Sequence, residues 1–186
     1  MNKGKVVLAF VIALSAGGAS CTDPARDREI EALGGEDPNV PPGPDHRPGQ
    51  PCVLCHSEGG PAEKSPFAVA GTIYETPAPG SKGANNVFVQ LVDGNGGVPR
   101  FAGQSTASGN FFILKKDWPD MAFPLRVALY KNPDEAPTIT MQSLIGRDGS
   151  CNYCHEPNLE PPFSDLEADR MRYKIPQIYL SAGGGT

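Results

Sequence analysis

The chain has 186 residues, enough for one compact domain with arms or for two very small domains. Its 16 basic and 21 acidic residues make it mildly acidic, which argues against a nucleic-acid partner. Its 22 glycines and 20 prolines exclude a bundle of long helices as the main architecture, and they predict a folded part with irregular stretches around it.

The first twenty residues have the layout of a bacterial secretory signal peptide. Two lysines precede an apolar run at residues 6–16, which is too short to span a bilayer, and small residues follow it. Residues 18–21, Gly-Ala-Ser-Cys, resemble the lipobox of bacterial lipoproteins, which implies lipidation of Cys21. The alternative is cleavage a few residues away, which leaves Cys21 as a spare thiol. We therefore expect a signal peptide at 1–20 and export to the bacterial periplasm or outer membrane, with a lipid anchor as the only membrane attachment.

Residues 21–50 are predicted to be a tether. Thirteen of the 28 residues from 34 to 61 are glycine or proline, a composition that cannot sustain a helix and that favours a semi-extended spacer. Two further segments, at 51–66 and 147–186, each contain a cysteine motif that is described below. Between them, residues 67–146 are predicted to fold.

Apolar and polar residues alternate with a period of two from Phe67 onwards, as expected for half-buried β-strands. Turn sequences at 95–97 (Asn-Gly-Gly) and 108–110 (Ser-Gly-Asn) separate the runs. The fold class is therefore mainly β, a small antiparallel β-sandwich of six to seven strands flanked by irregular segments. The expected strands lie near residues 67–74, 87–92, 98–104, 111–114, 125–130 and 138–143.

This middle piece is similar to the carboxypeptidase regulatory-like family. The similarity rests on a glycine in the first strand, a Gly-Ala pair before the second, and a Thr-Gly-Phe series at the next turn. These residues are Gly71, Gly83, Ala84, Val87, Thr106, Gly109 and Phe111. The resemblance implies a prealbumin- or immunoglobulin-like sandwich that is a scaffold without chemistry of its own.

The motif Cys-x-x-Cys-His occurs twice, at residues 52–56 and 151–155. It is the attachment motif of c-type haem, in which two thiols add to the vinyl groups and the histidine binds the iron. The alternatives are a redox dithiol, structural disulfides or a Cys/His zinc site, and each motif supplies only three zinc ligands. At these motifs the chain resembles a dihaem c-type cytochrome, which implies two covalent haem c groups. The implied attachment residues are Cys52, Cys55, Cys151 and Cys154, and the implied iron ligands are His56 and His155.

The remaining axial positions are harder to assign. His46 is the one histidine outside the motifs, so a single chain cannot supply both irons with two histidines each. His46 is either a distal ligand, of an iron that the sequence does not identify, or an exposed tether residue. Met171 is the preferred thioether ligand because its neighbours are polar, whereas Met141 and Met121 are the weaker candidates. Alternatively, a partner chain supplies the axial ligand, or the axial position is open.

The two motifs flank the predicted strands almost 100 residues apart. If the strand count is even, the chain enters and leaves the module at the same end, because neighbouring strands alternate in direction. Six strands therefore predict that the two motif segments lie together, close enough for electron exchange between their haems.

These patterns predict an electron carrier rather than a catalyst, one that passes single electrons between redox partner proteins at the cell envelope. A haem enzyme or gas sensor with one open iron site is an alternative. Another is a structural subunit of a multi-chain haem conduit. The sequence leaves the oligomeric state open.

Overall fold

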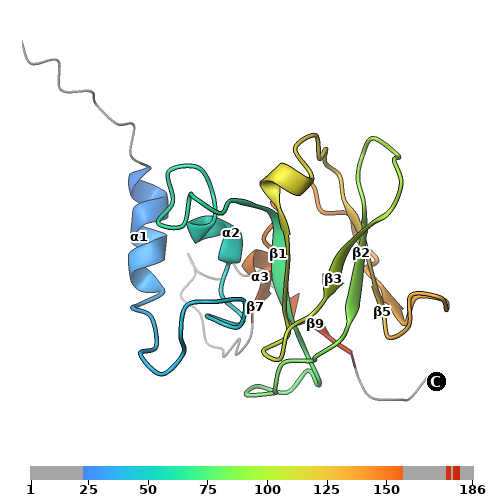
Figure 1. Cartoon of the computed structure of the whole chain (residues 1–186), viewed down its shortest axis with the longest axis horizontal. Coiled ribbons are helices and arrows are strands. Elements are labelled where there is room, and N and C mark those ends of the chain that lie inside the picture. The colour runs from blue at the N-terminus through green and yellow to red at the C-terminus, as the bar shows by residue number, and fades with distance from the viewer. Residues whose placement is uncertain (1–22, 157–174, 177, 181–186) are drawn as a thin grey trace, which may run out of the picture.

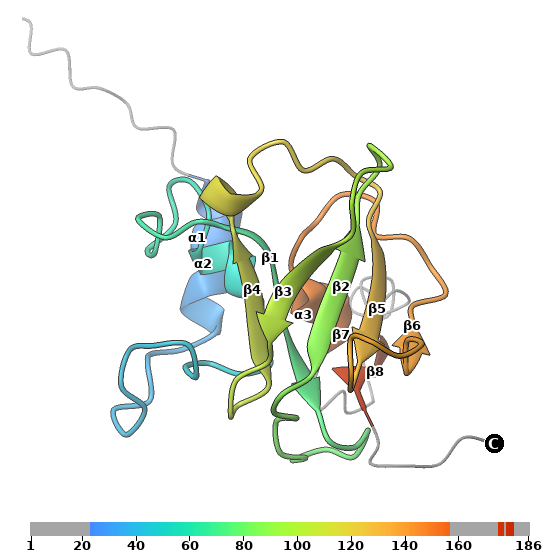
Figure 2. The same cartoon turned by 45° about the vertical axis from the view of Figure 1, so that its right-hand side comes forward.

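The computed structural model describes residues 23–156, 175–176 and 178–180. They form the mainly β fold that the sequence predicts, with two facing sheets (Figure 1 and Figure 2). One sheet has the strand order β4-β1-β9 and the other has the order β3-β2-β5-β6. Their strands are β1 (Phe67–Tyr74), β2 (Phe88–Val92), β3 (Arg100–Gln104), β4 (Asn110–Leu114), β5 (Arg126–Tyr130), β6 (Ile139–Thr140) and β9 (Ile178–Tyr179). The other elements are α1 (Pro24–Ala32), α2 (Cys52–Cys55), the 3-10 helix η1 (Lys115–Asp117), α3 (Cys151–Cys154), β7 (His155–Glu156) and β8 (Ile175–Pro176).

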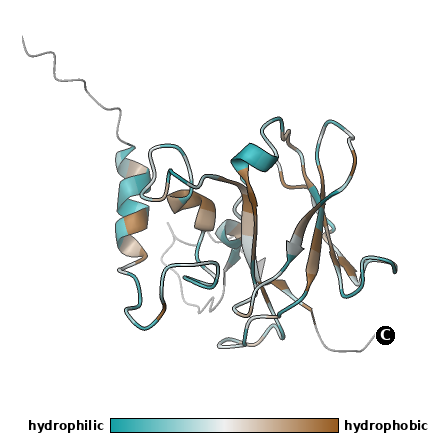
Figure 3. Ribbon diagram, viewed as in Figure 1, coloured by the Kyte–Doolittle hydropathy of each residue, from teal (hydrophilic) through white to brown (hydrophobic). Residues whose placement is uncertain are grey.

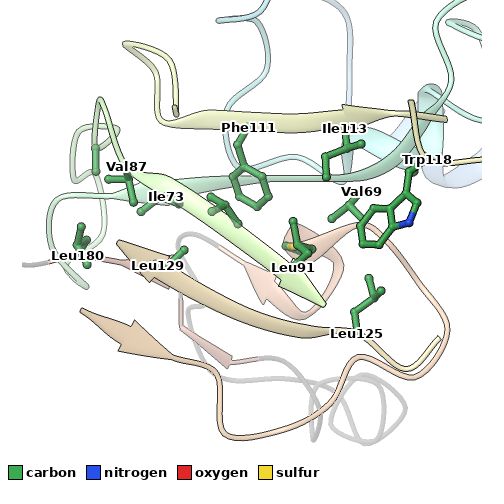
Figure 4. Close-up of a cluster of buried hydrophobic side chains, with 14 residues drawn as sticks. Val69, Ile73, Val87, Leu91, Phe111, Ile113, Trp118, Leu125, Leu129 and Leu180 are labelled. Carbon is green, nitrogen blue, oxygen red and sulfur yellow. The ribbon is translucent and has the colours of Figure 1, made fainter. Parts of the chain in front are cut away.

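The core lies between the inner faces of the two sheets. In β2, Val89 and Leu91 are fully buried while their neighbours are partly exposed, which is the alternation that identified this strand. Trp118 is buried at one end of the core. Figure 4 shows the facing side chains, among them Val69, Ile73, Phe111 and Ile113 opposite Leu91, Leu125 and Leu129.

Strand β1 is buried on both faces and along both edges. Its inner face contributes to the core, and its partner on one edge is β4, antiparallel, with Gly71 opposite Phe111. On the other edge β9 pairs parallel with Ile73 and Tyr74, and Ser150 forms an isolated parallel bridge with Ala70. Residues that follow the predicted module in the chain therefore pair with its first strand.

The arrangement differs from the predicted one in its connections. β9 and the β7-β8 pair are parallel, and neither belongs to the predicted strands. β3 and β4 belong to different sheets, so the turn at 105–109 crosses between sheets instead of closing a hairpin. Gly109 has a φ of +83°, and a Cβ there would lie 2.0 Å from the Ile73 carbonyl oxygen. Only glycine fits this crossing point.

Residues 23–50, here called the N-terminal arm, pack against the domain where the sequence predicts a tether. Asp23 caps α1 by accepting from the Ala25 and Arg26 amides at 3.1 and 3.2 Å. The Arg26 guanidinium then donates to the carbonyl oxygens of Glu58 and Gly59 at 2.8 and 2.7 Å. α1 has no buried residue, so an apolar pattern could not reveal this docking.

The predicted signal peptide and Cys21 lie outside the described residues. Within the described ranges, no helix has both the length and the apolar character required to cross a membrane.

Candidate cofactor site

The first Cys-x-x-Cys-His motif forms one helical turn directly after Pro51. α2 covers Cys52–Cys55, and the His56 amide donates to the Cys52 carbonyl at 2.9 Å. Because residues three and four apart share a side of a helical turn, the two thiols and the imidazole can face the same space. Cys52, Cys55 and His56 do line a common cavity.

This cavity has a volume of about 540 Å³ and mostly apolar walls. It is lined by residues of the N-terminal arm and α2 and by residues of β1 and β4. Figure 3 shows the apolar character of α2. Sites that hold cofactors typically have volumes of about 300–1,000 Å³. Its apolar walls include Leu33, Pro42, Pro44, Phe67, Phe112 and Leu114. The cavity thus has the size and the lining of a site for a flat, apolar prosthetic group.

Two histidines line this cavity, His56 from the motif and His46 from the N-terminal arm. Their ring centroids are 5.9 Å apart and their planes are inclined by 44°. His56 Nδ1 contacts the Ser65 carbonyl oxygen at 2.8 Å, and His46 Nδ1 contacts the Gly43 carbonyl oxygen. A carbonyl can only accept, so each Nδ1 carries the hydrogen and each neutral ring has its lone pair on Nε2. This tautomer is the one that binds a metal through Nε2.

Aromatic packing fixes the His56 ring. It stacks on Phe67 with ring centroids 3.9 Å apart, and Phe67 stacks on Phe112 at 4.7 Å. Burial lowers the pKa of His56 from its usual value, and the Ser65 carbonyl opposes this shift in part. The surroundings therefore favour the neutral imidazole that metal ligation requires.

Burial does not favour the thiolate form at three of the motif cysteines. Burial raises the pKa of Cys52 to about 11 and that of Cys151 to about 12, and it also raises the pKa of Cys55. A dithiol that exchanges disulfides needs the opposite shift, because its thiolate is the nucleophile. The described cysteines, Cys52, Cys55, Cys151 and Cys154, form no disulfide.

The second motif packs against β1. α3 begins after Ser150, and Cys151 belongs to the core between the sheets, whereas Cys154 is exposed and His155 is partly buried. A thioether link at Cys151 needs its sulfur to face a porphyrin, and here Cys151 packs among core residues instead. Residues 157–174, which follow the motif, lie outside the described residues. The donor set therefore fits a haem better at the first motif than at the second.

A buried polar bridge joins the two motif segments. Asn152 Nδ2 donates to the Gln50 carbonyl at 2.8 Å and to Thr72 Oγ1 at 3.0 Å, and Asn152 Oδ1 accepts from the Thr72 amide at 3.0 Å. The Gln50 carbonyl also accepts from Cys52 Sγ at 3.4 Å. The expectation that the two segments lie together is confirmed, since Asn152 is hydrogen-bonded to Gln50, the residue just before the first segment and 102 positions away. Electron exchange between haems stays a prediction.

Asn152→Leu tests this bridge. We expect the free energy of unfolding to fall by about 2–3 kcal/mol, because the buried Thr72 amide loses its partner and the Gln50 carbonyl keeps only the weaker Cys52 thiol donor. Urea unfolding measures the change. The matched substitution Asn85→Leu, at an exposed site, should stay within about 0.5 kcal/mol. Equal losses in the two variants would contradict the bridge.

The remaining candidates have varied places. Met171 lies outside the described residues, as Cys21 does. Met121 packs against the core, and Met141 is partly buried just after β6. Tyr153, between the second pair of cysteines, is 44% exposed.

Sequence reasoning missed the residues that hold the cavity together. Asn110 and Thr72 are buried polar residues on β4 and β1, and they bind the N-terminal arm through Asn110 Nδ2 and Thr72 Oγ1. The signal in the sequence was a polar residue at a strand position that should be buried, because a buried polar group needs a hydrogen-bond partner. Its partner could not be read from the sequence.

Comparisons with protein-family models, with curated proteins and with solved structures found no match to this chain. Among the described residues, no group of three or more His, Cys, Asp or Glu side chains converges to hold a metal ion. A haem needs fewer protein ligands than a bare ion, because the porphyrin occupies four positions and leaves only the two axial ones.

Proposed function

We propose that this protein is an exported c-type cytochrome that carries single electrons between redox partner proteins at the cell envelope. One observation supports this function above the others. The residues of the first Cys-x-x-Cys-His motif line an apolar cavity of about 540 Å³ together with a second histidine. A porphyrin needs this combination of thiols, imidazole and apolar walls.

At the first motif, Cys52 and Cys55 would hold the haem by thioether bonds and His56 would bind its iron. The bound iron supplies the chemistry, a reversible one-electron change between its ferric and ferrous forms. Phe67 and Phe112 fix the His56 ring, and the Ser65 carbonyl fixes its tautomer. The apolar walls exclude water and so disfavour the more highly charged ferric form, which raises the potential.

At the second motif, we propose a second haem c on Cys151 and Cys154, with His155 as the iron ligand and Met171 as the preferred distal ligand. This haem requires the Cys151 sulfur to leave the core position described above. The Asn152–Gln50 hydrogen bond keeps the two attachment segments in contact. This contact supports electron exchange between two haems of one chain.

Export and anchoring are part of the proposal. The signal-like residues 1–20 and the lipobox-like sequence before Cys21 support a lipoprotein of the periplasm or outer membrane. Cys21→Ser should move the protein from the membrane fraction to the soluble periplasmic fraction, because a diacylated cysteine is its only proposed anchor. An unchanged distribution between the fractions would contradict the anchor while leaving the haem sites untouched.

The intact mass of the exported protein, taken together with its reduced absorption spectrum, tests the proposal. We expect the mass of two haems above that of the processed chain and the bands of haem c. A colourless protein with the bare mass overturns the proposal. A five-coordinate haem in the wild type that binds carbon monoxide favours the enzyme or gas-sensor alternative.

A further inference from the structure

We propose that His46 is the second axial ligand of the iron held at the first motif, so that this haem has one histidine on each side. The inference rests on the function proposed above and assigns a residue that the sequence could not assign to either iron. It comes from the position of His46 in the wall of the cavity that Cys52, Cys55 and His56 line.

The separation of the two rings fits ligation of one iron. A first-row metal binds a histidine nitrogen at about 2 Å, so two imidazoles on opposite sides of one metal have ring centroids about 6 Å apart. The His46 and His56 centroids are 5.9 Å apart. The two residues are only ten positions apart in the sequence but come from different segments, the N-terminal arm and the end of α2.

Both rings also have the tautomer that ligation requires. The Nδ1 atom of each donates to a backbone carbonyl, Gly43 for His46 and Ser65 for His56. This leaves the two Nε2 atoms as the lone-pair nitrogens. An imidazole held by a backbone carbonyl at its far nitrogen is typical of metal-binding histidines.

The backbone around His46 is held in place by β4. Asn110 Nδ2 donates to the carbonyl oxygens of Pro44 and His46 at 3.0 and 2.9 Å. The Asp45 carboxylate accepts from the Ser108 amide at 3.0 Å. Farther along the arm, the Gly49 amide donates to Thr72 Oγ1 at 2.8 Å. His46 is therefore a positioned residue of the cavity wall and not part of a free tether.

The second motif is a poorer destination for His46. None of its residues, 151–155, lines the cavity in which His46 lies. His46 and Cys151 are on opposite sides of β1, since the arm binds Thr72 on the outer face while Cys151 belongs to the core between the sheets.

The test uses the full exported chain with His46→Ala, and with Asn39→Ala as a control at an exposed position of the same arm. Intact mass counts the haems, and carbon monoxide binding to the reduced protein counts open irons. We expect His46→Ala to keep the wild-type haem number and to gain one carbon monoxide site per chain, with a high-spin signal that added imidazole abolishes. Asn39→Ala should match the wild type.

Three results separate the possible failures. No haem mass in the wild type overturns the proposed function itself. Wild-type haem mass with unchanged carbon monoxide binding in His46→Ala overturns the assignment of His46 alone. In a chain that carries Cys52→Ser and Cys55→Ser, His46→Ala should have no further effect, so a newly opened iron there shows that His46 serves the second haem and also overturns the assignment.

A fourth variant covers poor haem incorporation by His46→Ala. His46→Met supplies a thioether in place of the imidazole, and a His/Met haem has a higher midpoint potential than a His/His haem. We expect one of the two midpoint potentials of this variant to rise. Potentials equal to those of the wild type would overturn the inference.

Discussion

Replacing Cys52 and Cys55 together with serine is expected to remove one haem from each chain and to leave the β-sandwich folded. Both thioether bonds of the first site are lost, and the partly buried thiols are not members of the core cluster. The intact mass should fall by one haem, and the absorbance of the reduced protein should fall to about half if both sites bind equally. Circular dichroism should keep the β signature of the wild type.

The corresponding change at the second motif should behave differently. Cys151→Ser puts a hydroxyl group among core residues, which we expect to cost about 1–3 kcal/mol of unfolding free energy in addition to the haem. Urea unfolding of the haem-free chains, expressed without the haem-attachment machinery, isolates this effect. Equal stabilities of the two variants would contradict the core position of Cys151. An unchanged haem count in the Cys52/Cys55 variant would contradict the first site.

Gly71→Val is expected to cost about 3 kcal/mol of unfolding free energy, because β1 has no room for a side chain at this position. A Cβ at Gly71 would lie 2.7 Å from Cys151 Cβ and 2.9 Å from the Phe111 ring. Neither neighbour can move far, since both are buried core residues. Urea unfolding of the haem-free chain measures the loss directly.

The matched control is Gly146→Val. No atom lies within 4 Å of the position that a Cβ would take at this glycine. We expect the unfolding free energy of this variant to stay within about 1 kcal/mol of the wild type, the range of ordinary strain or propensity effects. A comparable loss in both variants would show that the Gly71 effect comes from glycine replacement in general and not from crowding against Cys151.

The β-sandwich could be predicted because the sequence of each strand shows which of its residues are buried and which are exposed. Val89 and Leu91 point inward and alternate with partly exposed neighbours, so the period of two is visible within five residues. The grouping of Cys52, Cys55 and His56 on one cavity was equally local, because residues three and four apart share a side of a helical turn. Predictions of this kind need no knowledge of distant residues.

The parts that the sequence left open depend on contacts between distant segments. Arg26 of α1 donates hydrogen bonds to carbonyl oxygens 32 and 33 residues away. Such bonds do not change the hydropathy pattern, so the pattern could not predict them. The place of His46 in the cavity wall depends on Asn110, which lies 64 residues beyond it and donates to its carbonyl oxygen. The parallel pairing of β9 with β1 likewise involves residues more than 100 positions apart. Neither the period of apolar residues nor the spacing of a motif contains information about such distant pairings.

The burial of Cys151 sets an order of events for the maturation of this protein. Once the two sheets have closed, this sulfur lies inside the sandwich, beyond the reach of any enzyme that joins a vinyl group to a thiol. If a haem is attached at the second motif as proposed, the bond to Cys151 therefore has to form before the two sheets close. The first motif lies at the domain surface, so a haem could be attached there before or after the sheets close.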